Sequence, residues 1–312
     1  MPQSGLYKGT YSGVNYGTNR GTASGMGYGL QSVTSPIYEA ETIAWVKQLS
    51  SPPSPQYLYA VDALITSLKR ASIWFQLDRL WIFATEQQAH AHVSLVNPNG
   101  INAPWPTILY DGPPNLPVLA TWNANKGYTG NGSSMYLNTN YNPATNAKNL
   151  SLNSCSAGVY TTGTDTATSP FPIPFAIETR PGGTSYTLAL EPWSWTGTQW
   201  QSSGGVWATT GPATTPGATE LTQKGLFTVV RSNITTQFIA NLGIVLATNQ
   251  NASLQIPSGN IPIMVGNNRG TLGNWSSNTY SMFYAGSGTI DQVEFYNIFQ
   301  IFAKRVGFSV GA

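Results

Sequence analysis

Two segments near the N-terminal end of the chain carry apolar residues at helical spacing. Residues 36–49 have one about every three positions, and residues 54–70 follow a period close to 3.6. Each segment opens with Ser-Pro, which supplies an N-cap and a first-turn proline. We therefore expect two helices separated by the break SSPPSP. The apolar positions are Ile37, Ala40, Ile43, Val46 and Leu49 in the first segment, and Leu58, Val61, Leu64, Ile65 and Leu68 in the second.

The pattern that follows these helices predicts a transition to β-structure. Residues 80–84 are too few and too apolar for a surface helix, so they are expected to form a buried strand. Residues 86–96 are expected to form a short helix. We assign residues 36–96 to a small helical lead-in subdomain, followed by a proline-rich connection up to residue 117.

From residue 118 onward, short apolar runs alternate with Gly, Pro and Asn turns. Runs of this length and spacing indicate an antiparallel jelly-roll β-sandwich. The expected strands are 118–122, 134–138, 150–160, 175–179, 185–190, 226–231, 236–240, 243–247, 261–265 and 280–284. Residues 289–306 return to helical spacing and carry Lys304 and Arg305 in the last turn, which predicts a closing C-terminal helix.

Charged residues are scarce along the whole chain. They make up 8% of the 312 residues, whereas about 25% is usual. A surface of amides and hydroxyls is typical of extracellular or particle-bound β-proteins. The net charge of +2 is spread over single Lys and Arg residues, so we expect no nucleic-acid partner. The single cysteine, Cys155, excludes an intrachain disulfide and is expected to be a small buried residue.

The chain shows neither a signal-peptide pattern at its N-terminus nor an apolar stretch approaching the roughly 18 residues of a membrane span. We therefore expect no membrane insertion. An extracellular type of surface without a secretion signal favours synthesis in a host cytoplasm and release inside a virus particle.

Residues 1–35 form a Gly/Tyr-rich segment that cannot bury enough apolar area to fold alone. Two interpretations stay open: a disordered tail, or an assembly arm that becomes ordered against a neighbouring subunit. In the second interpretation, the tyrosines supply the buried contacts. They are Tyr7, Tyr11, Tyr16 and Tyr28.

Three stretches in this order resemble a phage virion arrangement with a concanavalin A-like (laminin-G-like) jelly roll. They are the lead-in SLKRASIWFQLDRLWIFATEQQAHAHVSLVNP at 67–98, the sandwich entry WNANKGYTGNGSSMYLNTNYNPATNAKN at 122–149, and the closing helix IDQVEFYNIFQIFAKRVG at 290–307. The resemblance implies a lectin-like sandwich in a head, fibre or tail component. It implies no ligand, because such sandwiches serve both as sugar binders and as inert building blocks.

The richest aromatic cluster is EPWSWTGTQWQSSGGVW. Its indole rings could stack on pyranose rings while its glutamines bond sugar hydroxyls. Alternatively, the tryptophans pack against a sheet face and shield a loop. The candidate carbohydrate-binding residues are Trp193, Trp195, Trp200, Trp207, Gln199 and Gln201.

Side chains for catalysis or metal binding are sparse. A glycosidase on such a sandwich needs paired carboxylates, whereas the acids of this region are isolated in the sequence or lie in the terminal helix, as Asp291 and Glu294 do. His90 and His92 are two positions apart on an expected helix and do not share a face. Asp111 and Asp165 each lack a second acid for calcium. We expect no enzyme, no cofactor and no metal site.

The sequence thus predicts a mainly β protein with three parts: an arm at 1–35, a helical lead-in at 36–96, and a concanavalin A-like sandwich with a closing helix at 97–312. The expected function is that of a non-enzymatic phage virion structural protein in head decoration, a fibre or a tail. Its expected partners are other virion proteins and further copies of itself. The alternative is a receptor-recognition module that binds host surface glycan through residues 193–207.

Overall fold

The computed structural model describes residues 38–98, 107–110, 121–163, 174–179, 186–195, 200–206, 213–215, 224–250, 252–253, 255–264, 266–268, 271–273 and 275–308. Residues from Tyr38 onward form one compact unit. The predicted divisions at residues 35 and 96 remain predictions, and the arm tyrosines Tyr7, Tyr11, Tyr16 and Tyr28 lie outside the described residues.

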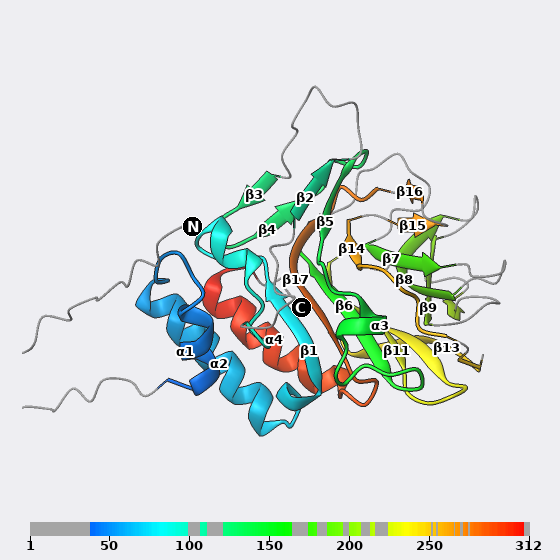
Figure 1. The fold of residues 1–312 in the computed structure, drawn as a ribbon, viewed down its shortest axis with the longest axis horizontal. Helices are drawn as coiled ribbons and strands as arrows, with labels where there is room; N and C mark the ends of the chain where they lie inside the picture. The colour runs from blue at the N-terminus through cyan, green and yellow to red at the C-terminus, as the bar shows by residue number, and fades with distance from the viewer. Residues whose placement is uncertain are drawn as a thin grey trace, which may run out of the picture. The chain divides into compact units, whose positions relative to one another are not determined.

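Apart from the short helix α3, the helical elements lie near the beginning and the end of this unit (Figure 1). They are α1 (Ala40–Val46), α2 (Pro55–Arg70), η1 (Trp74–Gln76), η2 (Gln88–His92), α3 (Pro143–Asn146) and α4 (Gln292–Val306). The expected cap forms at α2, where Ser54 accepts the Tyr57 N–H. At the start of α4, Asp291 accepts the N–H groups of Val293 and Glu294. No helix in the described ranges is both long and apolar enough to cross a membrane.

The strands form two antiparallel sheets, apart from one short parallel bridge between β15 and β7. Sheet A has the order β13-β12-β11-β6-β17-β4-β3, with β1 also paired to β17. Its strands are β1 (Leu77–Ile82), β3 (Thr121–Asn123), β4 (Gly127–Thr129), β6 (Cys155–Thr161), β11 (Gly225–Arg231), β12 (Gln237–Asn241), β13 (Ile244–Asn249) and β17 (Thr279–Gly286).

Sheet B has the order β10-β9-β8-β7-β14-β5-β2, with β15 joining β7 to β16. Its strands are β2 (Thr107–Tyr110), β5 (Met135–Asn138), β7 (Phe175–Thr179), β8 (Tyr186–Trp195), β9 (Trp200–Val206), β10 (Ala213–Thr215), β14 (Pro262–Ile263), β15 (Gly266–Asn268) and β16 (Thr271–Gly273).

A first hydrophobic core lies between the two sheets. It joins inward side chains of sheet A, such as Val159 and Phe283, to Phe175 and Leu188 of sheet B. The rings of Phe283 and Phe175 meet edge to face with centroids 5.7 Å apart, which is a favourable aromatic geometry. The thiol of Cys155 is buried in this core, as expected. The predicted antiparallel sandwich is therefore confirmed.

A second core lies on the other face of sheet A, where α2 and α4 cover it (Figure 1). Tyr284 of β17 contacts Phe295 of α4 with ring centroids 4.6 Å apart, and Tyr160 of β6 contacts Phe299 at 5.1 Å. Burial of both faces explains why β6 and β17 are almost wholly apolar or small. The helical lead-in and the closing helix thus share one core with the sandwich.

Several predicted elements differ from the structure. Residues 86–96 form only the 3₁₀ turn η2, after which Leu95 donates its N–H to the Leu80 carbonyl beside β1. The strand expected at 150–160 begins at Cys155, because the preceding residues form a turn closed by Ser151 and Ser154. Val293, placed on the apolar stripe of the C-terminal helix, is 53% exposed.

The turn before β6 is held by the buried carboxylate of Asp78 on β1. Its oxygens accept the backbone N–H groups of Lys148, Asn149 and Leu150 at 2.7–3.0 Å, and the hydroxyl of Tyr141 at 2.9 Å. Burial, and next the Asp78 charge, raise the pKa of Tyr141 well above its usual value. Asp78 therefore fixes the path from α3 into the sandwich.

We predict that Asp78→Asn lowers the free energy of unfolding by about 3 kcal/mol, because an amide removes the charge and directs a donor at backbone N–H groups. Urea denaturation checks this value. The matched control is Glu294→Gln on the exposed first turn of α4, which should cost less than about 0.5 kcal/mol. Equal effects of the two substitutions would contradict the role assigned to Asp78.

Candidate functional site

The predicted aromatic site lies at the end of the β8–β9 hairpin. The two strands pair so that Trp195 stands opposite Trp200, and Ser194 stands opposite Gln201. The register shifts between Glu191 and Ser194, just before this end of the hairpin. The hairpin therefore brings together two of the tryptophans along its backbone.

The structure describes only one of the three other tryptophan and glutamine residues predicted for this site. Trp193 lies in β8, while Gln199 and Trp207 fall outside the described residues. The described residues contain no group of three or more His, Cys, Asp or Glu side chains that could hold a metal ion.

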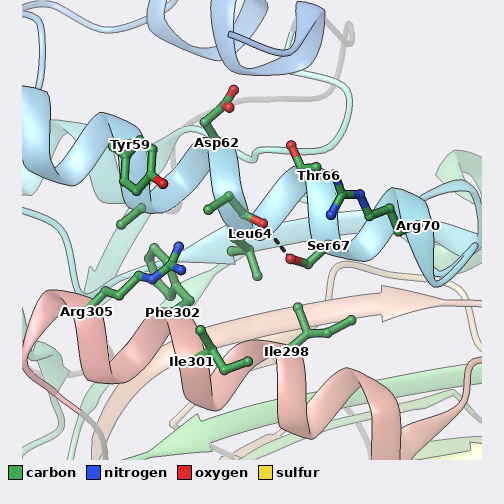
Figure 2. Close-up of a pocket in the computed structure, with 12 residues that line it drawn as sticks. Tyr59, Asp62, Leu64, Thr66, Ser67, Arg70, Ile298, Ile301, Phe302 and Arg305 are labelled. Atoms are coloured by element: carbon green, nitrogen blue, oxygen red, sulfur yellow. Dashed lines mark hydrogen bonds between the residues drawn. The ribbon is translucent and has the colours of Figure 1, made fainter. Parts of the chain in front are cut away.

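A groove that the sequence did not reveal runs between α2 and α4, with a cavity volume of about 330 Å³ (Figure 2). Its floor contains the buried side chains of Leu64 and Phe302. Its rims carry Tyr59 from α2, which is 61% exposed, and Ile301 from α4, which is 55% exposed. Tyr59 and Ile301 both lie off the apolar stripes of their helices. A large apolar or aromatic residue on the otherwise polar face of a helix was therefore the one sequence feature that could have indicated this groove.

Two arginines flank the groove. The Arg305 guanidinium lies over the ring of Tyr59, 5.8 Å from its centroid, while Arg70 stands at the opposite end (Figure 2). The helix dipole alone accounts for bases in the last turns of α2 and α4, so sequence reasoning gave them no binding role. The groove thus combines an apolar floor with cationic ends.

The polar groups of α2 on the side of α1 are already engaged. Asp62 accepts the Glu39 N–H and the Thr42 hydroxyl, both at 2.7 Å. Lys69 forms salt bridges with Glu39 and Glu41 at 2.8 and 2.9 Å. The hydrogen bond between Glu39 and Lys69 is the largest cause of the lowered pKa of Glu39. These contacts anchor α1 to α2, although Asp62 also borders the groove.

A second, smaller pocket of about 120 Å³ adjoins Arg305 and is lined by Glu86 and Asn125. The Glu86 carboxylate accepts both the N–H and the hydroxyl of Ser54, so it also holds the start of α2. The Asn125 side-chain oxygen is buried without a hydrogen-bond partner among the described residues. Arg305 is therefore common to the groove and this polar pocket.

The two histidines of η2 have separate partners. His90 is buried with its Nε2 at 3.3 Å from the Ser51 hydroxyl, and the His92 Nε2 lies 2.6 Å from the Tyr128 hydroxyl. Burial lowers the pKa of each histidine and raises that of Tyr128 to about 12. Both imidazoles pack the turn against neighbouring elements.

Comparisons with known proteins found similarity in structure alone. No family model and no curated protein matches the sequence. A trans-sialidase-active mutant of Trypanosoma rangeli sialidase is 12% identical, with a TM-score of 0.49 over 81% of this chain and 40% of that one. Domain 4 of AbnA, a GH43 arabinanase from Geobacillus stearothermophilus in complex with arabinotriose, is 10% identical, with a TM-score of 0.42 over 72% and 98%.

A third structure is the CBM40 of the Ruminococcus gnavus IT-sialidase bound to α2,3 sialyllactose. It is 12% identical, with a TM-score of 0.35 over 47% of this chain and 83% of that one. These neighbours are a sialidase, a domain of an arabinanase and a carbohydrate-binding module. The chain spans 40% of the length of the sialidase, and none of these structures shows a phage origin.

The expectation that the protein is not an enzyme needs correction. The structural neighbours include sialidases and a domain of a glycoside hydrolase, so the fold gives no ground for excluding glycan chemistry. The wide spacing of acidic residues along the sequence was an insufficient reason to exclude an enzyme, because strand pairing brings distant segments of the chain together. Glu178 of β7 stands opposite Thr187 of β8, for example, so Glu191 is thirteen residues away in the sequence but only four positions away along the paired strands.

We predict that acidification destabilises the protein through the two histidines of η2. Because the folded-state pKa of each lies below the unfolded value of about 6.5, the unfolded chain binds more protons below that pH. The free energy of unfolding should therefore fall between pH 7.5 and 5 more steeply in the wild type than in a His90→Gln, His92→Gln double variant. Parallel slopes in urea denaturation would refute this assignment.

Proposed function

We propose that the protein is a lectin-like glycan-binding protein that uses the end of the β8–β9 hairpin. The observation that carries this proposal is the register that sets Trp195 opposite Trp200 and Ser194 opposite Gln201. An indole ring has apolar faces that can stack on a sugar ring, and amide and hydroxyl side chains such as those of Gln201 and Ser194 can bond sugar hydroxyl groups. We assign Trp193, Trp207 and Gln199 to the same site as parts of this proposal.

The layer arrangement supports the choice of sheet B. Helices α2 and α4 cover the outer face of sheet A, so a ligand that lies against a sheet has to approach sheet B or its hairpins. Sialyllactose and arabinotriose, the sugars bound in two of the structural neighbours, are suitable first probes. A host surface glycan is the corresponding natural partner in this proposal.

We predict that a glycan array carrying sialylated and arabinose-containing oligosaccharides captures the full-length protein, and that Trp195→Ala and Trp200→Ala each weaken capture by roughly three- to tenfold. The control is Phe75→Ala, which removes an aromatic side chain that is 63% exposed elsewhere. Binding that survives both tryptophan substitutions would refute the site, and an array without any captured glycan would refute the function. Analysis of the captured glycans for cleavage tests catalysis in parallel.

A role as a virion structural protein in head decoration, a fibre or a tail is a second proposal. It is supported by the resemblance of residues 67–98, 122–149 and 290–307 to phage virion proteins, and by a Gly/Tyr-rich segment that precedes the compact unit. Other virion proteins and further copies of this chain are the partners in this proposal, and the particle surface is the location.

We predict that deletion of residues 1–35 leaves a folded protein that no longer enters particles. Ordering an arm costs on the order of 1–2 kcal/mol per residue, so it binds only where tyrosines and leucines are buried against a neighbour. Particle composition measured by mass spectrometry checks this, with circular dichroism as the control for folding. Normal occupancy by the truncated protein would mean that the segment has no assembly role.

A further inference from the structure

The two arginines of the α2–α4 groove stand about three helical turns apart. Arg305 lies on the ring of Tyr59, and Tyr59 precedes Arg70 by eleven residues on α2, a rise of roughly 16 Å. Figure 2 shows the same order, with Tyr59 and Arg305 at one end of the groove and Arg70 at the other. The two guanidinium groups therefore mark the ends of one elongated surface.

Neither arginine forms a salt bridge with an acid in the described part of the chain. The salt bridges found there belong to Lys69, which pairs with Glu39 and Glu41 on the side of α1. Asp62, the acid that borders the groove, is held through one carboxylate oxygen by Glu39 and Thr42. Two guanidinium groups thus remain at the groove without a salt bridge to these residues.

Between the arginines, the floor of the groove is apolar, while its α2 side also carries the polar side chains of Asp62, Thr66 and Ser67. Ile298 and Phe302 of α4 and Leu64 of α2 form the buried floor, and Ile301 stands exposed on the rim. An exposed isoleucine beside a buried apolar floor gains free energy when a partner covers it. An apolar floor between two cationic ends therefore favours a ligand that is apolar in the middle and anionic at both ends.

We propose that this groove binds an amphipathic acidic helix of a partner protein. Two antiparallel helices offer a groove in which a third helix can pack, with its apolar stripe against the floor. Acidic residues at positions i and i+11 of that helix lie on one face about 16 Å apart, which matches the spacing of Arg70 and Arg305. The proposal is independent of glycan binding at the β8–β9 hairpin.

The charges of this chain argue against its own segments as the occupant. Residues 1–37 contain Lys8 and Arg20 and no acidic residue, so the predicted arm would bring like charge to the groove. A second copy would present α2 or α4, each of which carries two bases in its last turn. An acidic partner helix is the occupant with complementary charge.

The test uses the full-length protein and a synthetic probe. The probe is a fluorescein-labelled peptide of about 16 residues with two glutamates eleven positions apart and leucines on the same face between them. In fluorescence anisotropy we expect this peptide to bind, while a version with lysine in place of both glutamates does not. Arg70→Gln and Arg305→Gln should each weaken binding by about threefold, as expected for exposed ion pairs.

A matched pair of variants separates the groove from the rest of α4. Ile301→Gln should weaken binding of the peptide, whereas Val293→Gln, at a similarly exposed position of the same helix but outside the groove, should leave it unchanged. Both side chains are more than half exposed, so both variants should fold, and circular dichroism confirms this.

Several outcomes would overturn the proposal. One is absence of binding by the acidic peptide, and another is equal binding of the acidic and lysine peptides. A third is binding that Arg70→Gln, Arg305→Gln and Ile301→Gln leave unchanged. Concentration-dependent dimers in sedimentation that Ile301→Gln abolishes would assign the groove to a second copy. Stronger peptide binding after deletion of residues 1–35 would assign it to the arm.

Discussion

Burial of both faces of strand β17 is the constraint on which the rest of the structure depends. One face gives Phe283 to the core between the sheets, and the other gives Tyr284 to the core beneath α4. The same strand pairs with β6, β4 and β1, so it joins the sandwich to the helical lead-in. A polar substitution on either face would therefore disturb two layers at once.

The parts of the fold that the sequence predicts well are those set by local chemistry. Ser54 caps α2 as its position suggests, and the strands at 175–179 and 226–231 lie within a residue of the expected bounds. The errors occur where a distant group decides the local structure. Asp78 takes the N–H groups of residues 148–150, and this contact turns the first part of an expected strand into a loop.

The candidate sites were harder to predict because they depend on pairing between distant segments. The aromatic content of residues 193–207 was evident, but the register that sets Trp195 opposite Trp200 emerges only from the paired strands. The α2–α4 groove needs two helices that are more than two hundred residues apart in the chain. Tyr59 and Ile301 are ordinary surface residues in the sequence and become the two rims of one groove in the fold.

The late position of β17 also governs how the chain can acquire its fold during synthesis. Leu77 of β1 pairs with Gly286 of β17, more than two hundred residues later in the chain. The ribosome therefore completes α2 and β1 long before their partner strand and covering helix exist. Contacts of such long sequence separation form slowly, and the apolar face of α2 stays without its main partner until residues 279–306 emerge. Premature termination before residue 279 would therefore yield a chain with two unfinished cores, and aggregation would compete with folding.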